Sequence, residues 1–82
     1  MRLNDTNGHL VTSDLTYASF LMASGIIFIG LNPRQGKPSE FIFQRPPDDI
    51  ISAWQRGEDK VSARAFHEAL RNLQGTLRQG GK

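Results

Sequence analysis

The side chains of this sequence that could carry acid–base or nucleophilic chemistry include two histidines, His9 and His67. Such chemistry needs a nucleophile, a base and an orienting residue that point toward one another. His67 and Glu68 are adjacent on a predicted helix, where successive side chains point about 100° apart, so they cannot form such a pair. We therefore expect no catalytic residue and no enzymatic activity. We interpret His67 as a solvated helix residue and His9 as part of a mobile terminus.

Two acidic pairs, Asp48–Asp49 and Glu58–Asp59, could supply carboxylate oxygens to a hard cation. Each pair precedes or opens a predicted helix, however, where the helix dipole favours acidic side chains. The sequence has no cysteine, which excludes disulfides and thiolate metal sites, and its glycines do not form a phosphate-binding loop. We expect no metal, no cofactor and no small-molecule substrate.

Three arginines, Arg64, Arg71 and Arg78, recur every seven residues in the last predicted helix. At 1.5 Å per residue they form a ridge about 20 Å long on one side of that helix. The ridge can bind nucleic-acid phosphates or the carboxylates of a protein partner, or it can be solvated and without a partner. The net charge of only +2 and the lack of aromatic residues between the basic ones argue against nucleic acid.

A first helix is predicted between a capping segment and a glycine. Thr12 or Ser13 can cap it, Asp14 suits its first turn, and Gly25 should end it in a left-handed conformation. Apolar residues recur between these ends at three- and four-residue spacing, which indicates a wide apolar face. These residues are Leu15, Tyr17, Ala18, Phe20, Leu21 and Met22.

A β-hairpin is predicted next, with strands at Ile26–Leu31 and Ser39–Arg45. The connection over residues 32–38 contains two prolines and a glycine, so we expect its tip at residues 34–37 to be mobile and exposed. The first strand is apolar on both faces, and a hairpin is rarely stable alone. It should therefore pair with a third strand at His9–Thr12 or with a second copy of the protein.

The hairpin supplies four candidate partner-binding residues. Ile27 and Ile29 belong to its doubly apolar strand, and Arg34 and Lys37 to its tip. Trp54 is a fifth candidate, either as an anchor for a protein partner or as a core residue that packs over the hairpin.

Two helices should follow the hairpin. Pro46–Pro47 starts a short one, which Gly57 ends, with Ile50, Ile51 and Trp54 on its apolar face. The last helix should begin near Asp59 or Lys60 and carry an apolar stripe as far as Leu77.

These elements predict one small α+β domain over residues 1–82, ordered at about 10–77 with flexible termini. Three helices should pack on a small antiparallel hairpin, with the third N-terminal strand as an addition, in the order (β)-α-β-β-α-α. A chain of this length buries only about 60 to 65% of its unfolded surface, so the core is thin. No apolar run approaches the roughly 20 residues that span a bilayer, and no basic-then-apolar leader is visible. We expect a cytoplasmic protein without membrane contact.

Three segments of the sequence form a recognisable set: Thr12-x-Asp14-Leu15-x-x-Ala18-x-Phe20-Leu21-x-Ala23-x-Gly25, Phe41-x-Phe43, and Val61-x-Ala63-Arg64 leading into Ala69-Leu70-Arg71-x-Leu73. Together they resemble an uncharacterised family of small bacterial and phage domains, a domain of unknown function. The resemblance covers residues 11–77. It implies an α+β fold and a phage or mobile-element setting, in which a small protein can inhibit a host complex. It brings no activity, cofactor or catalytic residue.

The sequence as a whole predicts a small non-enzymatic protein-binding or accessory module that self-associates, for example as a homodimer. The alternative is a nucleic-acid-binding protein that uses the ridge of Arg64, Arg71 and Arg78.

Overall fold

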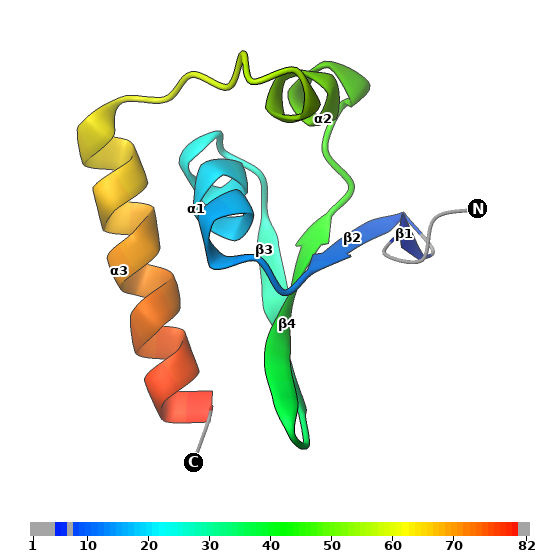
Figure 1. Cartoon of the computed structure of the whole chain (residues 1–82), viewed down its shortest axis with the longest axis vertical. Coiled ribbons are helices and arrows are strands. Elements are labelled where there is room, and N and C mark those ends of the chain that lie inside the picture. Colours follow the sequence, from blue (N-terminus) through cyan, green and yellow to red (C-terminus); the bar gives the residue numbers. More distant parts are fainter. Residues whose placement is uncertain (1–4, 7, 81–82) are drawn as a thin grey trace.

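The computed structural model describes residues 5–6 and 8–80, which form one antiparallel sheet and three helices (Figure 1). The elements are β1 (Asp5–Thr6), β2 (His9–Thr12), α1 (Leu15–Ala23), β3 (Phe28–Arg34), β4 (Lys37–Gln44), α2 (Asp48–Gln55) and α3 (Ala63–Gly80). The strand order in the sheet is β1-β2-β4-β3. The predicted α+β class is confirmed, and so is the third strand at His9–Thr12. The two-residue strand β1 was not predicted.

The N-terminal strands pair with only one side of the hairpin. β2 pairs with β4 in antiparallel fashion, which places Leu10 opposite Phe43 and Thr12 opposite Phe41. β3 therefore lies at the other edge of the sheet, with no further strand beside it among the described residues. The predicted third strand thus covers the second strand of the hairpin and leaves the doubly apolar first strand at an edge.

The hairpin turn is tighter than predicted. Only two residues, Gln35 and Gly36, connect β3 and β4, in place of the expected connection over residues 32–38. Gly36 has a φ of 74°, which glycine adopts without strain. Pro33 is tolerated in β3 because an edge strand can lack an N–H group, and Pro38 lies where the β3–β4 register is irregular. Most of the expected loop is therefore part of the strands.

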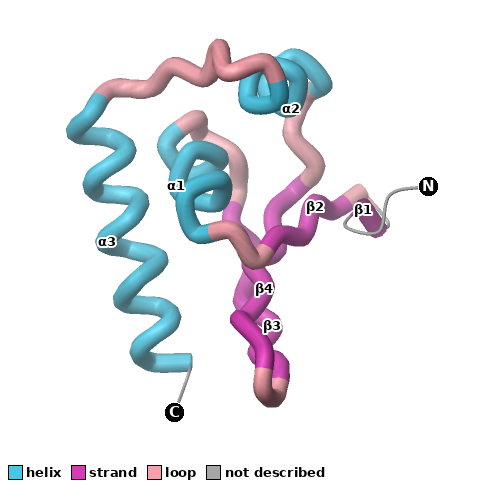
Figure 2. Tube along the Cα trace, in the orientation of Figure 1, coloured by secondary structure: helices cyan, strands magenta, loops and turns pink. Residues whose placement is uncertain are grey.

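Helix α1 is covered on two sides, because it lies between the sheet and α3 (Figures 1 and 2). Ala18 and Leu21 are fully buried, and Phe20 is 2% exposed. Ser19 is buried as well, and its hydroxyl donates a hydrogen bond of 2.8 Å to the Leu15 carbonyl. The one buried hydroxyl of this helix is therefore satisfied, as burial of a polar group requires.

Asp14, and not Thr12 or Ser13, is the N-cap of α1. Its Oδ1 accepts hydrogen bonds from the backbone N–H groups of Thr16 (2.9 Å) and Tyr17 (3.2 Å). The Thr12 hydroxyl oxygen accepts the Asp14 N–H at 3.1 Å and so orients the capping residue. An aspartate at this position also suits the positive end of the helix dipole.

Gly25 ends α1 as predicted. Its φ is 88°, and its N–H donates to the Met22 carbonyl at 3.0 Å. The next N–H, of Ile26, donates to the Leu21 carbonyl at 3.0 Å. This pair of bonds is a Schellman motif, which turns the chain from α1 toward β3.

The hydrophobic core forms where β4 faces α1 and α3. Its fully buried aromatic residues are Phe41 and Phe43 of β4, and Leu73 is its buried contribution from α3. By contrast, α2 has no buried residue, and its apolar side chains only pack against the margin of the core. The two long layers, the sheet and α3, are thus held together through α1.

The last helix differs at both ends from the prediction. It begins at Ala63, later than Asp59 or Lys60, and the Ser62 hydroxyl oxygen accepts the Ala65 N–H at 3.0 Å. It continues to Gly80, beyond the predicted limit of order at Leu77. The sequence also predicts flexible termini, but residues 1–4, 7, 81 and 82 lie outside the described residues.

We expect Asp14→Ala to lower the free energy of unfolding by about 1 kcal/mol, because two N–H groups at the start of α1 lose their acceptor. Denaturant unfolding followed by circular dichroism measures this change. Asp59→Ala is the matched control, since Asp59 is exposed and has no hydrogen bond to a described residue. It should change stability by less than about 0.5 kcal/mol. Equal effects of both substitutions would contradict the role of Asp14.

Candidate functional site

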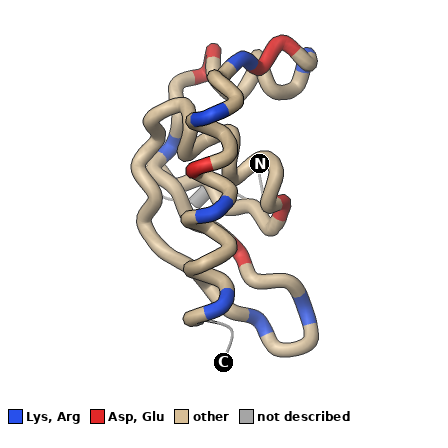
Figure 3. Tube along the Cα trace, turned by 90° about the vertical axis from the view of Figure 1, so that its left-hand side faces the viewer, with Lys and Arg blue, Asp and Glu red and all other residues tan. Residues whose placement is uncertain are grey.

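The arginine ridge of α3 is exposed. Arg64, Arg71 and Arg78 form no ion pair with any described residue. They lie within about 40° of one another around the helix axis, opposite the buried residues Ala69 and Leu73. Figure 3 shows the basic positions spaced along α3 on the side that faces the viewer. The three arginines therefore share the outer surface of α3, with the exposed Glu68 between the first two.

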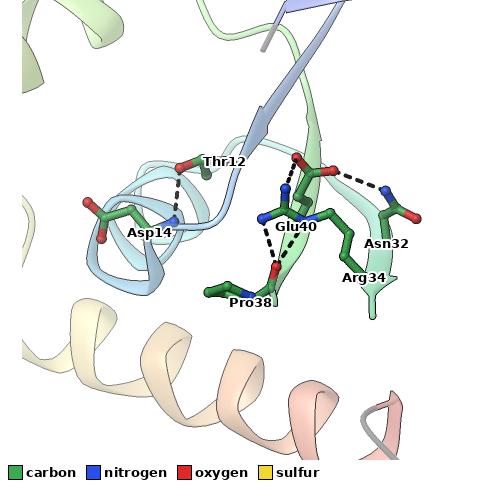
Figure 4. Close-up of polar contacts among 6 residues, drawn as sticks. All are labelled: Thr12, Asp14, Asn32, Arg34, Pro38 and Glu40. Carbon is green, nitrogen blue, oxygen red and sulfur yellow. Dashed lines mark hydrogen bonds and ion pairs between the residues drawn. The ribbon is translucent and has the colours of Figure 1, made fainter. Parts of the chain in front are cut away.

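The hairpin tip is not a second free basic site, because the Arg34 guanidinium forms its hydrogen bonds and its ion pair within the hairpin (Figure 4). Its Nε and Nη2 groups donate to the Pro38 carbonyl at 3.0 and 2.9 Å, and its Nη1 lies 3.5 Å from the Glu40 carboxylate. Glu40 also accepts a hydrogen bond from the Asn32 amide at 3.0 Å. Of the two candidates at the tip, only Lys37 is exposed and without an ion pair to a described residue.

Trp54 packs on α1, at the margin of the hydrophobic core. Its ring stacks on Tyr17 and Phe20, with centroid distances of 4.9 and 5.2 Å. Stacked aromatic pairs of this kind add stability beyond the area they bury. Trp54 therefore joins α2 to α1 and is partly buried, and its role as an anchor for a partner stays a prediction.

The sheet has a face that no described helix covers. In Figure 1, α1 and α3 lie on one side of the β3–β4 hairpin, and α2 lies beyond one end of it. Ile27 and Ile29, which are 58% and 46% exposed, are the exposed large hydrophobic residues of the described chain. Val11 and Ile42 are cross-strand partners on β2 and β4, and they alternate with residues that face the core. We call these four residues the open sheet face.

A β-bulge explains why a strand that is apolar on both faces has one face exposed. Phe28 pairs with Phe43 and Gly30 with Ile42, so Ile29 is an extra residue on β3. The bulge allows both Phe28 and Leu31, three residues apart, to pack against the core. Ile27 and Ile29 are left on the outside.

The sequence prediction named Ile27 and Ile29 but missed their neighbours Val11 and Ile42. The alternation within β4 could have identified Ile42, because it separates the two core residues Phe41 and Phe43. Val11 could not be assigned to a face before its partner strand was known.

Titratable groups do not gather into a cluster in the described part of the chain. No group of three or more His, Asp or Glu residues there could hold a metal ion. His9 lies on β2 and His67 on α3, so the two histidines belong to different layers. None of the helices between residues 8 and 80 has the length and apolar character that a membrane crossing requires.

Comparison with known proteins adds no relative. No family model, no curated protein and no solved structure matches this chain.

Burial raises the pKa of the Tyr17 phenol above its ordinary value of 10.0. The phenol of the folded state loses its proton at a higher pH than the phenol of the unfolded state, so deprotonation favours unfolding. This contribution to the free energy of unfolding is present below pH 10 and is lost as the pH rises through the folded pKa. Tyr17 is the only tyrosine, so tyrosinate absorbance reports on it alone. We expect a titration midpoint above 10.0 in the folded protein and a lower one in denaturant.

Tyr17→Phe is the control for this titration, because it keeps an aromatic ring on Trp54 and removes the ionisable group. The variant should lose less stability at alkaline pH than the wild type does. A folded-state midpoint at or below 10.0 would contradict the burial of Tyr17 beneath α2.

Proposed function

We propose that this protein is a non-enzymatic binding module that associates with a second copy of itself through the open sheet face. The observation that carries the proposal is the exposure of Ile27 and Ile29, at 58% and 46%, beside Val11 and Ile42. Burying apolar surface of this kind is the main favourable contribution to association. The proposal places the protein in the cytoplasm, an expectation that rests on the sequence.

The geometry of β3 favours contact between faces over pairing between edges. A bulge at Ile29 interrupts the ladder, and Pro33 offers no N–H to an incoming strand. Natural sheets use both features to prevent edge-to-edge pairing. A second copy is therefore expected to pack on the side chains of the open sheet face and not to extend the sheet.

The charges near this face also permit a homotypic contact. Glu40 alternates with the core residue Phe41 and thus points to the open side, where it is paired with Arg34 at 3.5 Å. Like charges across an interface would disfavour association, but here the two charges cancel within each copy. The arginines of the ridge, which form no ion pair with a described residue, lie on α3, on the other side of the fold from the open sheet face.

The double variant Ile27→Ser, Ile29→Ser should convert a wild-type dimer into a monomer. Two half-exposed isoleucines on each of two copies, at about 1 kcal/mol each, amount to about 4 kcal/mol, or close to a thousandfold in Kd. Sedimentation equilibrium over a range of protein concentrations measures the change. The matched control is Ile27→Val, Ile29→Val, which keeps the face apolar and should still dimerise.

Circular dichroism at low concentration should show the same fold for both double variants, since neither isoleucine belongs to the buried core. A wild-type protein that stays monomeric at the highest concentration tested would contradict association with a second copy.

A further inference from the structure

We propose that the arginine ridge of Arg64, Arg71 and Arg78 binds the phosphate backbone of double-stranded nucleic acid. The ridge lies on the outer side of α3, and the open sheet face lies on the opposite side of the sheet from α1 (Figures 1 and 3). The inference rests on the charges of α3 and does not depend on the proposed self-association.

The spacing of the ridge suits a regular polyanion. The three arginines span about 21 Å along the helix, with about 10.5 Å between neighbours. A duplex carries one negative charge per about 1.7 Å of its axis, so roughly a dozen phosphates lie along that length. Each guanidinium can therefore reach a phosphate whatever the base sequence. None of the three first has to release an ion-pair partner among the described residues.

The residues around the ridge distinguish phosphate from an acidic protein surface. The exposed positions beside the arginines include His67, Asn72 and Gln74, and none of these is apolar. The centres of protein–protein interfaces are rich in aromatic and apolar residues, whereas interfaces with DNA are more polar and more positively charged. The outer side of α3 is polar and positively charged, as interfaces with DNA are.

The aromatic residues distinguish a duplex from a single strand. Proteins that bind single strands stack the bases on accessible aromatic side chains. The aromatic side chains of the described residues are all buried or half-buried, and Trp54 is stacked on Tyr17 and Phe20. The ridge therefore offers contacts to the backbone and none to unstacked bases.

A substitution of Glu68 tests this proposal, because it should raise the affinity of the ridge for the duplex. Glu68 is exposed between Arg64 and Arg71 and forms no ion pair with a described residue. Its negative charge lowers the attraction of the ridge for phosphate. Glu68→Gln should therefore tighten binding, whereas a substitution of any ridge arginine should weaken it.

The experiment is a titration of the isotope-labelled full chain with a short duplex DNA of mixed sequence, followed by amide chemical shifts. Shifts should concentrate on α3. With three phosphate contacts, the log–log slope of affinity against salt should be about −2.7, or about a fortyfold loss between about 50 and 200 mM salt. Arg71→Gln should reduce the slope by about 0.9.

The matched control is Arg56→Gln, which removes the same charge from an exposed arginine that pairs with Glu58 at 3.0 Å, away from α3. It should leave the slope unchanged. The Ile27→Ser, Ile29→Ser variant should still bind duplex, which separates this proposal from self-association.

Three results would overturn the assignment. One is the absence of shifts on α3 at about 50 mM salt, where phosphate contacts are strongest. Another is binding of poly-glutamate at least as tight as that of the duplex, which would assign the ridge to a protein carboxylate surface. The third is tighter binding of a single strand than of the duplex, with shifts in the aromatic residues around Trp54.

Discussion

Helix α1 is buried between the sheet and α3, and its packing joins these two layers. Ala18 and Leu21 are fully buried, and burying a leucine or phenylalanine side chain contributes about 1.5 to 3 kcal/mol. A chain of 82 residues supports one thin core, and α1 contributes Ala18, Phe20 and Leu21 to it. Its caps at Asp14 and Gly25 fix its length, so that it fits between the layers.

Both proposed binding surfaces follow from that arrangement. Because α1 and α3 stack on the same side of the sheet, no described helix covers the opposite side, and Ile27 and Ile29 are exposed there. Because α3 is the outermost layer, only the side with Ala69 and Leu73 is buried, and the arginines on its other side face solvent. Helix α2 packs on α1 through Trp54 and does not extend over the open sheet face.

The sequence was a good guide where structure is local. The Gly25 cap, the start of α2 at the prolines and the sides of α3 depend on residues a few positions apart, and these predictions agree with the structure. The sequence predicts the hairpin but too long a turn, because Pro33 and Pro38 are of the residue types that favour loops. A proline at a sheet edge or at a register irregularity is compatible with a strand, and only the pairing shows which strand is at the edge.

Features that depend on distant pairing could not be predicted. The bulge at Ile29 arises between β3 and β4, and the place of Val11 on the open sheet face depends on its pairing with Ile42. The contact of Trp54 with α1 joins elements that are more than thirty residues apart, counted from Tyr17 to Trp54. The heptad spacing of the arginines, in contrast, needed only a helix, so the ridge was recognisable before the fold was known.

The most direct test of this account is to measure how accessible the isoleucine methyl groups are to a soluble paramagnetic agent, at a protein concentration where the chain is monomeric. We expect strong broadening for Ile27 and Ile29 and little for the methyl groups of the buried residues Leu21 and Leu73. Protection of Ile27 and Ile29 equal to that of Leu21 in the monomer would contradict the account, because it would mean that the chain itself covers the open sheet face.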